Sequence, residues 1–118
     1  MITIYHNPRC SKSRETLALV EALNHAGEPL DIVEYLKQPP TAEQLQALHR
    51  QLGRPLRDML RDGEAPFDAL GLAAAETTDA QLYEAIAAHP ILLQRPIVVY
   101  RDRAAIGRPP EAIKSLFE

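Results

Sequence analysis

At 118 residues, with 46% hydrophobic and 25% charged residues, the chain has the composition of an ordinary soluble globular protein, and we expect one domain. The formal net charge of −3 provides no global positive field to attract nucleic acid or a membrane. A single cysteine cannot form an internal disulfide, which indicates a reducing compartment, most simply the cytoplasm.

The N-terminal third predicts a strand, a helix and a second strand. The β-branched and aromatic residues of Ile2–Tyr5 favour a strand. Helix formers fill Ser11–Ala26, and Gly27 stands where it could end that helix. Apolar and β-branched residues favour a second strand over Leu30–Leu36. Strand, helix and strand in this order form a βαβ unit, whose strands run parallel with a right-handed crossover.

The middle of the chain, from about residue 38 to 95, predicts several short helices inserted between two halves of a sheet. Thr41–Gln44 and Thr78–Gln81 have the capping-box pattern, in which a threonine begins a helix and a glutamine follows three residues later. We expect the first of these helices to end at Gly53 and another short helix to span Arg54–Asp62.

The C-terminal segment predicts two strands and a closing helix. The unbroken apolar run Ile97–Tyr100 is typical of a strand covered on both faces. Arg101–Arg103 is a plausible hairpin turn into a strand over Ala104–Ile106. Gly107–Pro110 then breaks the chain before a last helix. The predicted order is therefore βαβ, several helices, and ββα.

Cys10, the only cysteine, lies where the first predicted strand gives way to a helix. Ligands collect at the carboxyl ends of strands in open α/β sheets, and backbone N–H groups at a helix start stabilise an anion. We therefore expect a lowered pKa for the Cys10 thiol. Ser13 has a hydroxyl that could donate to the sulfur, and His6 and Arg9 could supply positive charge nearby.

Two interpretations of Cys10 stay open on this reasoning. Free cysteine is among the most buried residue types, and a lone one is usually inert packing. The strand-to-helix placement and the neighbouring basic residues favour a nucleophile instead, and they bring the two interpretations to about equal weight. A pKa of about 6.5 would raise the ionised fraction at pH 7 about 25-fold but lower nucleophilicity about 8-fold. Most of any rate must therefore come from groups that hold the other reactant.

Three separated motifs resemble the ArsC family of arsenate reductases, in particular its short YfgD-type members. They are ITIYHNPRCSKSRETL at residues 2–17, HPILLQRPIVVY at 89–100 and AIGRPPE at 105–111. The resemblance implies an α/β, thioredoxin-like (glutaredoxin-like) fold, with a four-stranded mixed sheet and a helical insertion. It also implies reduction of arsenate to arsenite, with glutathione as co-substrate, glutaredoxin as partner and no bound cofactor.

The resemblance also implies site residues. The family's nucleophile falls on Cys10, and its three oxyanion-handling arginines fall on Arg61, Arg95 and Arg108. Guanidinium forks suit arsenate, a tetrahedral oxyanion close to phosphate in charge and shape. Arg57, one helical turn before Arg61, could serve in its place.

Three other features bear on this predicted site. Pro96 resembles the cis-proline that stands opposite the active cysteine in thioredoxin-like folds, so we expect a cis Arg95–Pro96 peptide bond. His6 could tune Cys10 or merely finish the first strand. The four histidines lack metal-ligand spacing, so no metal site is expected.

Two other functions stay open. A glutathione-linked thiol oxidoreductase with another substrate would share the thiol and differ in its use of the arginines. Spx-type regulators, which bind RNA polymerase, resemble the same fold, but their redox switch typically has Cys-x-x-Cys, and Ser13 stands at the second position here. The single cysteine leaves the chain without an internal thiol to resolve an intermediate, which favours an external one such as glutathione.

Overall fold

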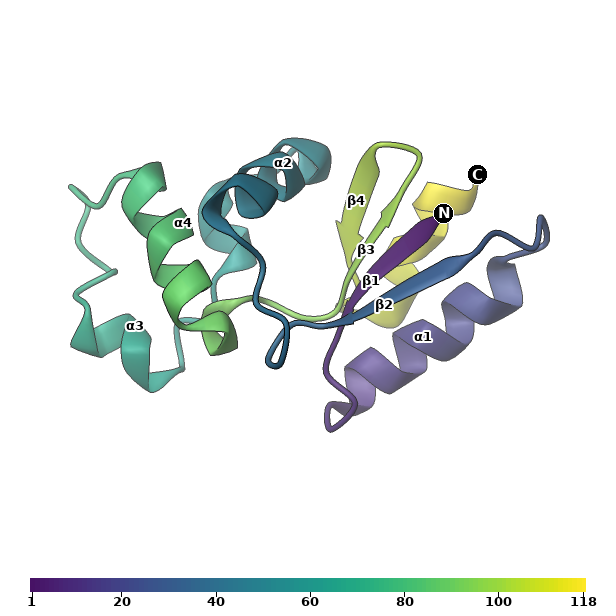
Figure 1. Ribbon diagram of the computed structural model, residues 1–118, viewed down its shortest axis with the longest axis horizontal. Coiled ribbons are helices and arrows are strands. Elements are labelled where there is room, and N and C mark those ends of the chain that lie inside the picture. Colours follow the sequence, from purple (N-terminus) through teal and green to yellow (C-terminus); the bar gives the residue numbers. More distant parts are fainter. The chain divides into compact units, whose positions relative to one another are not determined.

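The computed structural model describes residues 1–118, which fold as two compact units (Figure 1). An α/β unit comprises Met1–Gln38 and Arg95–Glu118, and a helical unit comprises Pro39–Gln94. No helix in either unit has the length and apolar character needed to span a membrane.

The α/β unit is built on one four-stranded mixed sheet with the order β2-β1-β3-β4. Its strands are β1 (Ile2–His6), β2 (Leu30–Glu34), β3 (Ile97–Tyr100) and β4 (Arg103–Ile106). β1 pairs in parallel with β2 and antiparallel with β3, and β3 pairs antiparallel with β4. Helix α1 (Ser11–Leu23) connects the two parallel strands, as the predicted βαβ unit requires.

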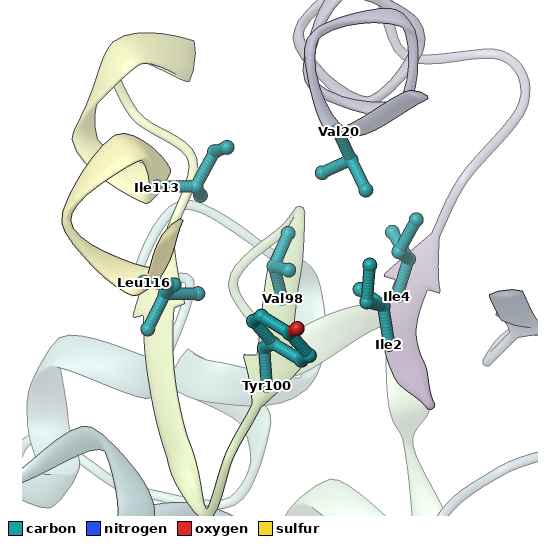
Figure 2. Close-up of a cluster of buried hydrophobic side chains, with 7 residues drawn as sticks. All are labelled: Ile2, Ile4, Val20, Val98, Tyr100, Ile113 and Leu116. Carbon is teal, nitrogen blue, oxygen red and sulfur yellow. The ribbon is translucent and has the colours of Figure 1, made fainter. Parts of the chain in front are cut away.

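One hydrophobic core holds α1 and the C-terminal 3₁₀ helix η3 (Pro110–Phe117) against this sheet. In Figure 2, Val20 from α1 and Ile113 from η3 point toward the strand residues between them. The core consists of Ile2, Ile4, Val20, Val98, Tyr100, Ile113 and Leu116. Alternate residues of β1 are buried, and each fully buried aliphatic side chain stabilises the fold by about 1.5–3 kcal/mol. This packing fixes where α1 begins relative to the end of β1.

Two predicted boundaries differ from the observed ones because local hydrogen bonds turn the chain earlier. α1 ends at Leu23 rather than Ala26, since the Asn24 amide exchanges two hydrogen bonds of 2.9 Å with the backbone of Glu28. That local ring competes with a further helical turn. β2 ends at Glu34 rather than Leu36, because the Glu34 carbonyl accepts from two backbone N–H groups of the following turn.

The predicted hairpin is confirmed. Arg101 and Asp102 form a two-residue turn between β3 and β4, and both have positive φ, 54° and 60°. This is the backbone of a type I′ turn, whose twist matches that of the strands it joins. Arg103 pairs with Tyr100 and so belongs to β4 rather than to the turn.

The helical unit consists of short elements with strong end signals. They are α2 (Ala42–Leu52), η1 (Leu56–Met59), α3 (Ala65–Ala69), α4 (Asp79–Ala88) and η2 (Pro90–Leu92). Both predicted capping boxes are present, with Thr41 before α2 and Thr78 before α4. Gly53 ends α2 in the left-handed conformation, with φ of 62°. The helix expected over Arg54–Asp62 is shorter, a 3₁₀ turn at Leu56–Met59.

A close approach at Gly107 joins three segments of the α/β unit. The Gly107 N–H donates to the Pro96 carbonyl at 2.8 Å, and the Thr16 hydroxyl donates to the Gly107 carbonyl at 3.5 Å. A Cβ atom on Gly107 would lie 2.6 Å from Thr16 Oγ1 and 2.9 Å from Pro96 Cγ. Thr16 is fully buried, so it has little room to move. Glycine is therefore required for the loop after β4 to lie on α1 and on the start of β3.

We expect Gly107→Ala to destabilise the protein, because the new methyl group overpacks a buried contact. Overpacking costs about 1–3 kcal/mol, and we expect a melting temperature lower by about 3 °C or more. Gly63→Ala is the matched control, since nothing lies within 4 Å of a Cβ built there. Equal melting temperatures for the two variants would show that the Gly107 contact is not tight.

Candidate thiol site

Cys10 is the N-cap residue of α1, at the carboxyl end of β1. Its backbone is extended (φ −97°, ψ 124°), and its carbonyl accepts the first hydrogen bond of the helix from the Arg14 N–H at 3.0 Å. The side chain is half-buried and makes no disulfide. Because the first backbone N–H groups of a helix have no partner within it, an N-cap side chain lies where they can stabilise a negative charge.

The loop before Cys10 is held by its own hydrogen bonds. The Asn7 carboxamide oxygen accepts from the Arg9 N–H at 3.0 Å, and the Asn7 N–H donates to Ser13 Oγ at 3.3 Å. Arg14 Nη1 donates to the Pro8 carbonyl at 2.9 Å. The Ser13 hydroxyl oxygen accepts from the loop backbone, and the backbone N–H of Ser13 favours the Cys10 thiolate. The expected donation from the Ser13 O–H to the sulfur stays a prediction.

Two arginines that are far from Cys10 in the sequence, Arg95 and Arg108, lie beside it. Arg108 Nε donates to the Arg95 carbonyl at 2.7 Å, and Arg108 Nη2 donates to Cys10 Sγ at 3.7 Å. Arg95 stands just before β3 and Arg108 just after β4, so the antiparallel pairing of these strands brings both to one edge of the sheet. The predicted cis Arg95–Pro96 peptide bond is present, and Arg108–Pro109 is also cis.

The surroundings of Cys10 lower its pKa to about 7. Burial opposes ionisation, but the backbone N–H of Ser13, the Arg95 guanidinium and the backbone N–H of Lys12 outweigh it and hold the pKa below its ordinary value. A group with a pKa near 7 is about half ionised at neutral pH, whereas an ordinary thiol is about 3% ionised. A pKa near 7 agrees with the lowered value expected for a thiol at the start of a helix.

The surroundings of His6 disfavour its charged form. It is the last residue of β1 and is buried. Burial lowers its pKa; Glu34 opposes this shift and Arg14 adds to it. The Nδ1 atom of His6 is buried and has no hydrogen-bond partner. Both roles considered for His6 stay predictions.

Tyr35 belongs beside this site, and sequence reasoning used it only as a strand former. It follows β2 directly and is fully buried. Burial raises the pKa of its phenol, and Arg95, Cys10 and Asn7 are near enough to influence it. The sequence placed Tyr35 near the end of the predicted strand Leu30–Leu36, and the carboxyl ends of parallel strands share the edge where Cys10 lies.

Arg61 and Arg57 both lie in the helical unit, and their guanidinium groups are used differently. Both Arg57 Nη atoms donate to backbone carbonyls, of Leu72 at 2.8 Å and of Ala74 at 3.2 Å. Arg61 Nη2 pairs with Glu64 at 3.4 Å, whereas its buried Nη1 has no partner. Arg57 therefore braces a loop, whereas the buried Nη1 of Arg61 has no hydrogen-bond partner. No group of three or more His, Cys, Asp or Glu residues gathers where it could hold a metal ion.

We expect the alkylation rate of Cys10 by iodoacetamide to rise with pH and to reach half its maximum near pH 7. The thiolate is the reactive form, so the rate follows its fraction. Arg95→Gln should move this midpoint upward, because it removes a positive charge that favours the thiolate. Arg9→Gln is the control, since Arg9 is exposed and water screens its charge. A midpoint near 8.5 in the native protein would contradict the lowered pKa.

Comparison with known proteins finds relatives that match nearly the whole chain. The ArsC family model matches residues 5–116. An arsenate reductase of Haemophilus influenzae is 42% identical over 113 residues, which is 95% of either chain. An arsenate reductase of Escherichia coli K12 is 41% identical over 112 residues, covering 95% of this chain and 77% of the longer relative.

A solved structure agrees with these relatives. An arsenate reductase from Vibrio cholerae superposes with a TM-score of 0.90 at 43% identity, covering 98% of this chain and 96% of its own. The strand order of the α/β unit and this likeness confirm the predicted thioredoxin-like fold. From the family match over nearly all its residues and from relatives of about 40% identity, the chain belongs to the ArsC family.

Proposed function

We propose that the protein is an enzyme that reduces arsenate to arsenite, with Cys10 as its single nucleophile. The observation that carries this proposal is one thiol with a pKa lowered to about 7 and an arginine donor 3.7 Å from its sulfur. An anionic nucleophile would repel an anionic substrate unless positive charge lies between them, and Arg108 supplies that charge. Relatives named arsenate reductase support the choice of oxyanion.

The arginines hold the oxyanion in this proposal. Arg108 is oriented by its Nε bond to the Arg95 carbonyl, which leaves the terminal nitrogens of its fork to face the thiol and an anion. Arg95 contributes a second positive charge, as its effect on the Cys10 pKa supports. For the third arginine we keep Arg61, which the resemblance to the family implies, over Arg57, because both Nη atoms of Arg57 already donate to backbone carbonyls. Bidentate guanidinium contacts suit a tetrahedral anion.

The first chemical step forms a sulfur–arsenic bond. The Cys10 thiolate attacks arsenic(V), and one arsenate oxygen leaves as hydroxide or, after protonation, as water. The oxidation states of arsenic and sulfur do not change in this step, since one ligand of arsenic replaces another. The helix N–H groups that stabilise the free thiolate also favour the negative adduct, which stays at the same position.

The second step moves two electrons to arsenic and needs an external thiol. A glutathione thiolate attacks the Cys10 sulfur, the sulfur–arsenic electron pair passes to arsenic, and arsenite leaves as arsenic(III). Cys10 is then joined to glutathione by a disulfide. A glutaredoxin thiolate attacks the glutathione sulfur and releases Cys10, whose lowered pKa makes it a good leaving group. The absence of a second cysteine from the sequence supports this use of outside thiols.

We expect purified protein to form arsenite from arsenate in the presence of glutathione and glutaredoxin, and Cys10→Ser to reduce this to the uncatalysed background. Arg95→Ala and Arg108→Ala should each lower kcat/KM for arsenate by roughly 10²-fold, the usual effect of removing a donor to a transition-state anion. Arg54→Ala is the control, because Arg54 is exposed and pairs only with Asp58, at 3.0 Å.

Full turnover by Cys10→Ser would rule out the covalent route. A second set of results would support a glutathione-linked thiol oxidoreductase that acts on another substrate. In that case the arginine variants keep wild-type activity in thiol–disulfide exchange with glutathione, and the wild-type protein forms no arsenite.

A further inference from the structure

We propose that Tyr35 is a further catalytic residue, whose hydroxyl donates a hydrogen bond to an oxygen of the oxyanion held at Cys10. This inference rests on the proposed function for the identity of the anion. Residue 35 lies outside the three sequence motifs that resemble the family.

The strand register places Tyr35 in line with residues of the thiol site. The parallel ladder of β1 and β2 ends with His6 opposite Glu34, and continuing its register brings Tyr35 beside Asn7. The antiparallel ladder of β1 and β3 pairs Tyr5 with Ile97, and continuing it brings Asn7 beside Arg95. Tyr35 and Arg95 therefore flank Asn7 at the edge of the sheet from which the Cys10 loop leaves.

The electrostatic surroundings of Tyr35 agree with that placement. Burial is the main influence on the phenol and raises its pKa, so the hydroxyl keeps its proton at neutral pH. Arg95 is the next influence and lowers the pKa, while the charge of Cys10 raises it. The hydroxyl is thus a neutral donor whose surroundings include Arg95 and Cys10, two residues of the thiol site.

The Tyr35 hydroxyl lacks the partner that a buried hydroxyl needs. The side chain is fully buried, and its hydroxyl makes no hydrogen bond of ordinary geometry within the protein. The side chains of Arg95 and Asn7 lie near enough to lower its pKa as weak hydrogen-bonding partners. Burying a hydroxyl without a partner destabilises a fold, and such a group in a native structure calls for an explanation. Phenylalanine would fill the same space without that cost. A ligand oxygen bound at the thiol would supply the missing acceptor.

A donor of this kind would act on the anion and leave the ionisation of the thiol unchanged. The groups that lower the Cys10 pKa are two backbone N–H groups and Arg95. Removing the Tyr35 hydroxyl should therefore weaken oxyanion binding while the pH midpoint of Cys10 alkylation stays near 7. It should also leave the ligand-free protein at least as stable as before, which a hydroxyl with a structural role would not do.

Tyr35→Phe tests the proposal with a readout that does not need turnover. Arsenate bound at the site should protect Cys10 from iodoacetamide, and the variant should need about tenfold more arsenate, or more, for half-protection. Its kcat/KM for arsenite formation should fall by at least about tenfold. Its melting temperature without arsenate should equal or exceed that of the wild type. Tyr100→Phe is the matched control, since Tyr100 donates to Glu28 at 3.5 Å and should leave protection unchanged.

The outcomes separate this inference from the proposed function. If Tyr35→Phe keeps wild-type protection and turnover, the hydroxyl does not bind the anion, although arsenate reduction stands. If arsenate protects wild-type Cys10 but no arsenite forms, the proposed function is wrong, and the protection data still decide the role of Tyr35. If arsenate gives no protection to the wild type, or if the variant loses stability without losing protection, the inference is overturned.

Discussion

The close approach of the Gly107 loop to α1 and to the start of β3 is the contact on which the thiol site depends. It places the residue after Gly107 where its guanidinium reaches both the Arg95 carbonyl, at 2.7 Å, and the Cys10 sulfur, at 3.7 Å. A side chain on residue 107 would push this loop away from the buried Thr16 and from Pro96. The electrostatics of the site therefore rest on a packing constraint, namely that one residue has no Cβ atom.

The lowered pKa of Cys10 explains only part of what the site can do. With a pKa of about 7, the ionised fraction at neutral pH is about 16-fold higher than for an ordinary thiol. The lower basicity reduces the nucleophilicity of each thiolate by about fivefold, so the net gain is only about threefold. Catalysis of the size that enzymes achieve must come from holding the oxyanion in line with the sulfur, which is a task for arginines and other donors.

A few buried polar side-chain atoms make no hydrogen bond within the protein, and His6 Nδ1, the Tyr35 hydroxyl and Arg61 Nη1 are among them. Both capped helices of the helical unit satisfy their first N–H groups, and Arg57 donates to two carbonyls. By contrast, the Tyr35 hydroxyl and Arg61 Nη1 are buried and unpartnered. Local rules of stability are expected to fail where function requires it. Each of these atoms belongs to a residue that the proposals assign to an anion.

The sequence by itself determined the features that depend on neighbouring residues. Capping boxes began α2 and α4 where expected, Gly53 ended α2, and Cys10 fell at a strand-to-helix junction. The resemblance of the motifs to the ArsC family assigned Arg95 and Arg108 to the site. Only the tertiary structure decided that Arg108 reaches a sulfur 98 residues away in sequence, that Tyr35 is buried beside Arg95, and that Ser13 acts through its backbone. Those facts follow from strand register and the packing of distant loops, which short-range sequence patterns do not encode.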